Sequence, residues 1–221
     1  NSFSCRVGKG THKGVDVLDT MLRKVSRNYS RTAYALKCDV RKFFDSVDHS
    51  ILIKLLRRKI KDSDTLWLME EIIENFAGES SDLFTRKGLP IGNLTSQLFA
   101  NVYMNEFDQF MKGELKIENY VRYTDDFVIV SDDENFLKDL IPKIQSFLGN
   151  KLALELHPSK ITIGKYQRGV DFLGYVSFPH YRALRKRTEK RMIRKLDEKI
   201  ELSKQGQVTE EKLKQTLSSY L

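Results

Sequence analysis

Three aspartates stand where a carboxylate could take part in catalysis. Asp39 closes an apolar run, AYALKCDV, while Asp125 and Asp126 separate two further apolar runs, YVRY and FVIV. Carboxylate oxygens are the hard ligands that Mg²⁺ prefers. Two such ions about 3.5–4 Å apart can stabilise both the attacking and the leaving oxygen of a phosphoryl transfer. The same residues could instead be ordinary turn residues, since Asp is frequent in turns.

The elements around these aspartates must bring positions 39 and 125 together. Within residues 33–40, apolar side chains alternate with Lys37 and Asp39, which predicts a strand with both charged side chains on one face. The runs at 120–123 and 127–130 predict a hairpin with Asp125 and Asp126 at its tip. Metal-dependent chemistry would require the hairpin tip and the end of the first strand to meet.

The remaining pattern predicts an α+β fold. Helical spacing of apolar residues predicts helices over 14–28, 51–60, from Asp64 to Phe76, 94–112 and 133–148. Pro142 predicts a kink or a late start in the last of these, and Asn93 and Thr209 are expected as helix caps. A turn is predicted over 41–49, a loop over 78–93, and strands over 152–156, 160–163 and 170–178. Helices should cover one face of a small antiparallel sheet and leave the other face free.

Composition limits the class of protein. The net charge is +8, and residues 182–195 hold eight basic side chains against one acid, Glu189. A polyanion bound along that segment would bind in a salt-sensitive way, although a solvated helix face is the simpler interpretation. No apolar run is long enough to cross a membrane, and two cysteines, Cys5 and Cys38, indicate a reducing cytoplasm. The first residue is not Met and the last lie in a helical pattern, so the chain reads as a piece of a longer protein.

Five segments resemble, in order, motifs A to E of reverse transcriptases: CDVRKFFDSVDH, GLPIGNLTSQLFANVYMNEFD, RYTDDFVIV, LHPSK and FLGY. The resemblance extends over most of the chain and points to bacterial enzymes of the family. It implies the palm of a right-hand polymerase, an antiparallel sheet backed by helices, with parts of the fingers and thumb. The implied limits are 1–32 for the fingers, 33–180 for the palm with a fingers-like insertion near 50–87, and 181–221 for the thumb. The implied activity is RNA-directed DNA synthesis.

The resemblance also implies roles around the metals. Asp39 and Asp125 would bridge two Mg²⁺ ions, for which Mn²⁺ could substitute, with Asp126 beside them and the Val40 carbonyl as a further ligand. Lys160 would protonate the departing pyrophosphate, since an ammonium group can both stabilise the phosphate charge and donate a proton. His157 is a weaker candidate for that role and is more simply a turn residue.

Further positions correspond to substrate contacts. Phe44 matches the steric gate that excludes a 2′-hydroxyl, although ordinary core packing would also explain it. The other positions expected to contact the incoming dNTP are Arg41, Lys42, Phe43, Ile91 and Gly92. Those expected to contact the RNA template and DNA primer are Arg6, Lys9, Tyr123, the primer-grip residues Phe172, Leu173, Gly174 and Tyr175, and Arg182, Arg185, Lys186 and Arg187. The primer-grip segment could equally be a plain core strand.

One departure indicates a subtype. Where many relatives have Gln-Gly and then Ser-Pro, this chain reads Ile91-Gly92-Asn93-Leu94-Thr95-Ser96-Gln97. That pattern is similar to the enzymes of diversity-generating retroelements, which copy RNA with errors at adenines and work with a small basic accessory protein. Ile91 cannot hydrogen-bond near the nascent base pair as Gln could, so we expect looser discrimination.

Other functions remain open on the sequence alone. A group II intron or phage-defence enzyme would share most of these motifs. A non-catalytic RNA-binding module with a polymerase-like sheet would be expected to lack the carboxylates, which are all present. A metal-dependent nuclease or cyclase could use an acidic hairpin, but would not account for Phe44 together with the LPIG and FLGY segments.

Overall fold

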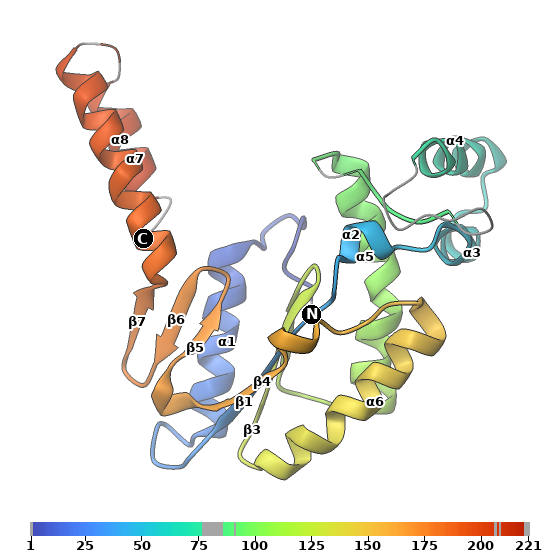
Figure 1. Cartoon of the computed structure of the whole chain (residues 1–221), viewed down its shortest axis with the longest axis horizontal. Coiled ribbons are helices and arrows are strands. Elements are labelled where there is room, and N and C mark those ends of the chain that lie inside the picture. Colours follow the sequence, from blue (N-terminus) through green and yellow to red (C-terminus); the bar gives the residue numbers. More distant parts are fainter. Residues whose placement is uncertain (1, 77–85, 91, 206, 208, 219–221) are drawn as a thin grey trace.

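The computed structural model describes residues 2–76, 86–90, 92–205, 207 and 209–218 (Figure 1). The α-helices are α1 (Thr11–Val25), α2 (Phe43–Ser46), α3 (His49–Lys59), α4 (Ser63–Glu74), α5 (Leu94–Gln109), α6 (Glu134–Leu152), α7 (Lys186–Lys204) and α8 (Glu210–Ser218). The strands are β1 (Tyr34–Asp39), β2 (Tyr120–Tyr123), β3 (Asp126–Ser131), β4 (Thr162–Lys165), β5 (Val170–Phe172), β6 (Tyr175–Phe178) and β7 (Tyr181–Leu184). A π-helical turn, Phe110–Glu114, extends α5, and two 3₁₀ turns are Pro158–Lys160 and Tyr166–Arg168.

The larger sheet has four antiparallel strands in the order β2-β3-β1-β4. The alternation over residues 33–40 and the two apolar runs form the predicted strand and hairpin. In the register of β1 against β3, Tyr34 lies opposite Ser131 and Asp39 lies opposite Asp126. The sheet therefore brings the end of β1 beside the hairpin tip.

One face of this sheet carries the main core. Leu36 and Cys38 point into it and are fully buried, together with Phe99, Tyr103 and Phe107 of α5. Helices α3, α5 and α6 lie on this side (Figure 1). Burying each such side chain contributes about 1.5–3 kcal/mol. Leu98, which the pattern of 94–112 places on the same face of its helix, is instead 54% exposed.

The prediction of a free second face is wrong. Val15, Leu18 and Leu22 of α1 pack with Val121 and Val128 of the sheet in a second core. Tyr166, Phe172 and Tyr175, which lie after β4, complete this core. The small residues and β-branched residues on the second face of the strands make it apolar along most of its length. Only the end that carries the aspartates is polar on this side.

The predicted strand over 170–178 is two strands. Leu173 and Gly174 form a tight turn between β5 and β6, with φ values of 52° and 89°. Two consecutive residues with positive φ match the twist of an antiparallel hairpin, and Gly adopts such a φ without strain. A third strand, β7, pairs with β6, so Arg182 lies in a sheet and not in the predicted basic helix.

The structure differs from four other expectations. The turn predicted over 41–49 contains the short helix α2. Helix α6 runs through Pro142 to Leu152, because buried residues at Leu137, Leu140, Ile144 and Leu148 hold its inner face. Residues 152–156 form no strand, since the helix ends at Ala153 in the left-handed region and only Leu156 bridges to Val40. Helix α1 begins and ends three residues before the predicted 14–28.

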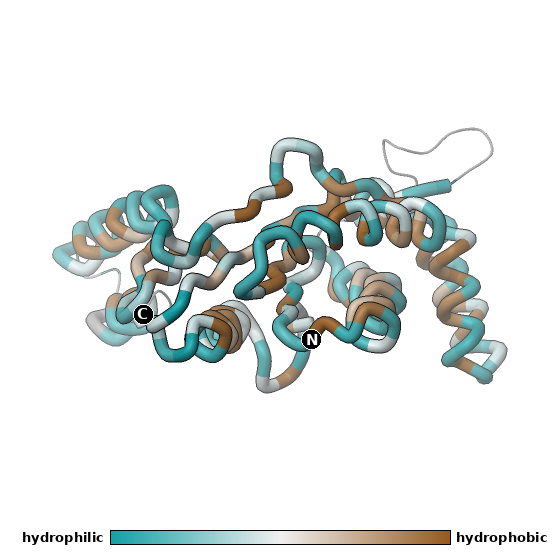
Figure 2. The backbone as a smooth tube through the Cα atoms, turned by 90° about the horizontal axis from the view of Figure 1, so that it is seen from below, coloured by the Kyte–Doolittle hydropathy of each residue, from teal (hydrophilic) through white to brown (hydrophobic). Residues whose placement is uncertain are grey.

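Helices α7 and α8 form a helical hairpin that extends away from both sheets (Figure 1). No residue of α7 is fully buried, and Ile193, Ile200 and Leu202 are substantially exposed. In Figure 2 hydrophobic and hydrophilic residues alternate along this hairpin at the left-hand end. Within the described parts of the chain, no helix is long and apolar enough to span a membrane, and both cysteines are free thiols.

Candidate active site

The three aspartates gather at one end of the larger sheet. Asp39 is the last residue of β1, Asp126 is the first of β3, and Asp125 lies in the two-residue turn of the hairpin. The amide of Val40 donates to the carbonyl of Asp125 at 3.3 Å, which holds the strand end against the turn. Thr124 adopts a φ of 55°, as the tight turn requires.

A buried ion pair fixes this hairpin to α5. The guanidinium of Arg122 donates from Nη2 to Oδ2 of Asp108 at 2.6 Å and from Nε to Oδ1 at 2.9 Å. Its third nitrogen donates to the carbonyl of Thr124 at 2.9 Å, in the turn itself. The side chains of Arg122 and Asp108 are 1% and 12% exposed. Sequence reasoning missed both residues, although an Arg inside an apolar strand signals a buried partner.

Lys160 lies on the first aspartate. Its Nζ is 2.9 Å from Oδ1 and 3.0 Å from Oδ2 of Asp39. The 3₁₀ turn that carries it is held by the amide of His157, which donates to the Asp39 carbonyl at 2.8 Å. The Nδ1 of His157 accepts from the amide of Ser159, so this histidine caps the turn. The structure therefore brings Lys160 to the carboxylates and gives His157 a structural role.

A second lysine links the aspartates to the base of α7. The Nζ of Lys37 lies 3.5 Å from Oδ2 of Asp126 and 3.7 Å from Oδ1 of Asp171 on β5. Asp171 also forms an ion pair with Arg185, the residue that precedes α7. The alternation of β1 placed Lys37 on the face of Asp39, but the partner on β5 was not visible in the sequence.

The local electrostatics penalise negative charge. The pKa of Asp126 is raised from 3.8 to about 6, chiefly by burial and also by the neighbouring Asp39 and Asp125, while Lys37 lowers it. Burial also raises the pKa of Asp125, with Asp39 adding to the shift. Burial, together with Asp126 and Asp39, raises the pKa of the Cys38 thiol to about 12. Crowded carboxylates of this kind are stabilised by a cation.

The donor set fits a hard divalent cation. The three carboxylates supply only oxygen ligands, and the Oδ1 of Asp126 is buried without a hydrogen-bond partner among the described residues. Within those residues, however, no three His, Cys, Asp or Glu side chains already converge as a metal-binding group. Lys160 and Lys37 currently neutralise Asp39 and Asp126.

The residues from Arg41 to Phe44, which follow β1, form a further side of the candidate site. Phe43 is buried and Phe44 half-buried, and their rings meet edge to face at 5.4 Å. The carbonyl of Phe44 accepts from the amide of Leu89 at 2.7 Å, which joins α2 to the loop before α5. Arg41 and Lys42 line a cavity of about 310 Å³ next to Glu155, to which Arg41 is paired at 3.6 Å.

The loop before α5 is described only in part. Ile91 lies outside the described residues. Gly92 is exposed with a φ of 99°, and a side chain built there would meet nothing within 4 Å. Asn93 occupies the predicted cap position of α5, but its side chain makes no capping hydrogen bond.

Comparison with known proteins identifies the family. Residues 1–177 match the family described as reverse transcriptase (RNA-dependent DNA polymerase), which covers both sheets as far as β6. The chain belongs to the reverse transcriptase family. Its fold agrees with telomerase structures from Candida species. Apo telomerase from Candida tropicalis, truncated from its C-terminal domain, has a TM-score of 0.59 at 15% identity over 80% of this chain and 40% of the other. Telomerase from Candida albicans bound to a fragment of telomeric RNA has a TM-score of 0.57 at 16% identity over 80% and 33%.

Curated relatives include proteins encoded in introns. Protein YkfC of Escherichia coli is 26% identical over 85% of this chain and 56% of its own length. The group II intron-encoded protein LtrA of Lactococcus lactis is 24% identical over 71% and 37%. The putative COX1/OXI3 intron 2 protein of Saccharomyces cerevisiae is 22% identical over 79% and 27%. The chain thus spans between about a quarter and just over half of the length of these reverse transcriptase relatives.

The N-terminal segment of this family member supports the hairpin. The amide of Phe3 donates to the carbonyl of Arg122, and the Oγ1 of Thr124 donates to the Oγ of Ser4 at 2.8 Å. Lys9 lies over the ring of Phe3, 4.8 Å from its centroid, and burial lowers the pKa of this lysine. Arg6 lines a cavity beside α3 and α5. Tyr123, at the end of β2, is half-buried against the second core.

The segment expected as the primer grip is the β5–β6 hairpin. Phe172 is fully buried and Tyr175 nearly so, and both belong to the second core. Gly174 faces α7, because a side chain built there would come within 3.1 Å of the Thr188 hydroxyl. The carbonyl of Gly174 also accepts from the amide of Arg185. Leu173, beside Gly174 in the turn, contacts the second core.

The expected basic contacts fall into two groups. Arg182 bonds to Asp16 at 2.8 Å and Asp19 at 2.5 Å on α1, and Arg185 pairs with Asp171. Lys186 and Arg187, in the first turn of α7, are exposed. The structure therefore gives Arg182 and Arg185 structural partners and leaves Lys186 and Arg187 on the surface.

Proposed function

We propose that this chain carries the palm of an RNA-directed DNA polymerase that extends a DNA primer along an RNA template. Family membership and the three crowded carboxylates of Asp39, Asp125 and Asp126 support the proposal. The observation that carries it is the register that sets Asp39 opposite Asp126 at the hairpin tip. We propose that residues 1–32 contribute to the fingers, 33–180 to the palm with an insertion near 50–87, and 181–221 to the start of the thumb.

Each residue of the site has a defined task in the proposed reaction. Asp39, Asp125, Asp126 and the Val40 carbonyl would hold two Mg²⁺ ions, or Mn²⁺ in their place. Those ions would lower the charge on the attacking primer 3′-oxygen and on the departing pyrophosphate. Lys160, now on Asp39, would donate a proton to that pyrophosphate. The lysine can reach the departing group only by leaving its carboxylate.

The walls of the site would select the substrate. Phe44 would lie under the sugar of the incoming dNTP and exclude a 2′-hydroxyl, with Phe43 holding its ring from the side. Arg41, Lys42, Ile91 and Gly92 would complete the dNTP site. The proposed template–primer contacts are Arg6, Lys9, Tyr123, the β5–β6 hairpin and the basic residues from Arg182 to Arg187.

Primer extension on an RNA template with Mg²⁺ and dNTPs tests the function. The wild-type protein should extend the primer, and Asp125→Asn should abolish synthesis while keeping template–primer binding. Asp133→Asn removes a carboxylate at the start of α6, where Asn can still cap the helix, and is a matched control that should retain synthesis. Binding without extension by the wild type would favour a non-catalytic RNA-binding module.

The subtype is a finer proposal. The Ile91-Gly92 to Ser96-Gln97 pattern supports an error-prone enzyme of a diversity-generating retroelement, which would work with a small basic accessory protein. The curated relatives favour a group II intron-type enzyme instead. Sequencing the cDNA made by wild type and Ile91→Gln separates them. Fewer errors opposite adenine in Ile91→Gln would support the first, and unchanged errors would count against it.

A further inference from the structure

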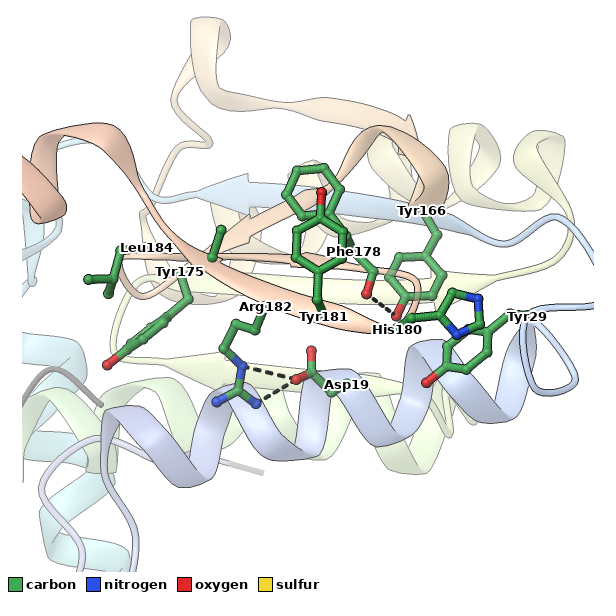
Figure 3. Close-up of a pocket in the computed structure, with 10 residues that line it drawn as sticks. Asp19, Tyr29, Tyr166, Tyr175, Phe178, His180, Tyr181, Arg182 and Leu184 are labelled. Atoms are coloured by element: carbon green, nitrogen blue, oxygen red, sulfur yellow. Dashed lines mark hydrogen bonds and ion pairs between the residues drawn. The ribbon is translucent and has the colours of Figure 1, made fainter.

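An aromatic pocket lies between α1 and the smaller sheet. It has a volume of about 470 Å³ and is bounded by α1, the loop after it, and the sheet of β6 and β7 (Figure 3). Its ring-bearing residues are Tyr29, Tyr166, Tyr175, Phe178, His180 and Tyr181. Tyr166 follows β4, and its amide bonds to the carbonyl of Ala33, just before β1 begins. The Tyr166 side of the pocket is therefore separated from Asp39 by the length of β1, about 20 Å.

Tyr166 and Tyr175 are buried in the second core, whereas Tyr181 and His180 are open to solvent. Phe178 and Tyr181 stack with centroids 4.8 Å apart and an interplanar angle of 14°. Tyr181 is nevertheless 61% exposed, so the ring is open away from Phe178. The ring centroids of His180 and Tyr29 are 4.4 Å apart, and His180 is also exposed. Figure 3 shows these rings around one opening, with Arg182 and Asp19 beside it.

The polar groups hold the pocket in shape. The hydroxyl of Tyr166 donates to the carbonyl of Phe178 at 3.0 Å and fixes the floor. Arg182 is bound by Asp19 and lies 5.7 Å from the centroid of Tyr175, so its charge is anchored at the rim. A pocket with rigid rings and one anchored guanidinium is suited to a flat, polar, aromatic ligand.

The surrounding charge points to a polyanion. The three segments that supply most of the rings, 26–33, 165–169 and 178–185, contain no acidic residue. They carry Arg27, Arg31, Lys165 and Arg168, which are all exposed. Arg182 and Arg185 are instead paired with Asp16, Asp19 and Asp171. Flat rings interleaved with basic side chains bind single-stranded nucleic acid, because bases stack on the rings while the backbone follows the positive charge.

We propose that the side of this pocket formed by Tyr29, His180 and Tyr181 binds an unpaired base of an RNA strand, next to the template–primer contacts proposed for Tyr175 and Arg182. The proposal rests on the proposed function, which makes RNA the partner of the chain. A duplex offers no unstacked base, so the pocket should distinguish single strands from blunt duplexes. It would hold a stretch of the RNA about one sheet length away from the point of synthesis.

Binding measurements with labelled oligonucleotides test the proposal. Tyr181→Ala should weaken binding of an unstructured RNA oligonucleotide about tenfold, the order expected for the loss of one base–aromatic stack. Binding of a blunt RNA–DNA duplex should not change. Tyr181→Phe keeps the ring and should bind as the wild type does. Phe136→Ala removes an exposed ring from α6 and is the matched control.

Photocrosslinking gives a second readout that does not depend on a variant. An RNA containing 4-thiouridine should crosslink to the wild type within residues 178–182 or at Tyr29. Binding of a DNA oligonucleotide of the same sequence tests whether the pocket distinguishes RNA from DNA. Equal losses for RNA and DNA in Tyr181→Ala would show that the base alone is read, and a loss confined to RNA would show that the sugar is read too.

Two outcomes would overturn the proposal. Unchanged RNA binding by Tyr181→Ala, or crosslinks confined to other parts of the chain, would show that the pocket takes no base. Primer extension on a blunt-ended template–primer reports separately on the aspartates. A protein that synthesises DNA but fails these tests would retain the proposed function and lose only the RNA-binding pocket.

Discussion

The ammonium group of Lys160 bridges both carboxylate oxygens of Asp39, at 2.9 Å and 3.0 Å. Those oxygens are the ones that a divalent cation would need, so the lysine and the cation compete for the same lone pairs. The Lys160 side chain is 52% exposed and can move away without disturbing the core.

Removal of Lys160 should therefore separate metal binding from catalysis. We expect Lys160→Ala to bind Mg²⁺ several-fold more tightly, because Asp39 loses its competitor. The same variant should incorporate a single nucleotide more slowly, since the proposed proton donor is gone. Thermal-shift titration with Mg²⁺ measures the first and rapid-quench kinetics the second. Lys143→Ala on α6 should change neither, and weaker Mg²⁺ binding by Lys160→Ala would contradict the competition.

The Phe44 ring predicts sugar discrimination. We expect Phe44→Ala to incorporate ribonucleotides at least tenfold more readily relative to deoxynucleotides, because the space of the ring becomes available to a 2′-hydroxyl. The measurement is the ratio of kcat/KM for a matched rNTP and dNTP. Phe136→Ala removes an exposed ring from α6 and should leave the ratio near that of the wild type. Strict exclusion by Phe44→Ala would place the gate elsewhere.

The raised pKa of Asp126 predicts a stability that depends on pH. Its pKa is about 6 in the folded chain against an ordinary 3.8, so the folded state holds the proton more tightly than the unfolded state. Stability contributed by the protonated group is full below pH 3.8 and is lost as the pH rises through 6. Asp126→Asn carries no such charge. The difference in free energy of unfolding between Asp126→Asn and the wild type should therefore increase, in favour of the variant, by up to about 3 kcal/mol between pH 4 and pH 7.

Urea denaturation in EDTA at both pH values measures this difference. Asp62 is a control whose pKa shift has the opposite sign, because its hydrogen bonds to Thr65 lower its pKa. Asp62→Asn should lose relative stability as the pH rises from well below 3.8, with little change between pH 4 and pH 7, whereas Asp126→Asn should gain stability between pH 4 and pH 7. A parallel loss in both variants would show that burial does not penalise the charge of Asp126.

The Arg122–Asp108 pair predicts a large loss of stability. Asp108→Asn leaves a buried guanidinium without its counter-charge, and breaking a buried pair in this way costs about 3–5 kcal/mol. Urea denaturation should show this loss, and hydrogen exchange should rise at the amides of the β2–β3 hairpin. Glu106→Gln on the same helix breaks the exposed pair with Arg58 and should cost less than about 1 kcal/mol. Similar losses in the two variants would rule out a special role for the buried pair.

The exposed basic side chains of α7 predict salt-dependent binding. If Arg187 contacts a phosphate of the template–primer, Arg187→Ala should reduce the slope of log K against log salt by about 0.9. Fluorescence anisotropy across a salt series gives that slope. Lys143→Ala, on the outer surface of α6, should leave it unchanged, and an unchanged slope in Arg187→Ala would remove this residue from the proposed interface.

The sequence predicts local elements well where one face of the element is buried. The strand with Asp39 could be predicted because charged and apolar residues alternate near its end, and the hairpin with Asp125 because two short apolar runs flank the Asp-Asp pair. The motif pattern also placed Lys160 near Asp39, although 121 positions separate them.

The errors arise where distant contacts outweigh local preference. Pro142 does not break α6, because the buried Leu and Ile residues on the inner face keep it helical. The two strands at 170–178 could not be separated, since apolar residues surround Gly174 on both sides. The links from Lys37 to Asp171 and from Arg122 to Asp108 depend on which strand or helix lies alongside, and the chain order does not reveal that.

Gly174 has no side chain, and this affects how the α7–α8 hairpin is oriented relative to the smaller sheet. Thr188 sits where a methyl group on residue 174 would need room, so even an alanine would act as a wedge beneath the first turn of α7. From Thr188 the helix continues to Lys204, roughly 24 Å further along its axis. A shift of a few tenths of an ångström at the first turn of α7 would tilt the helix and displace its far end by roughly 1–2 Å. The absence of a side chain at Gly174 therefore influences the direction in which the α7–α8 hairpin extends from the smaller sheet.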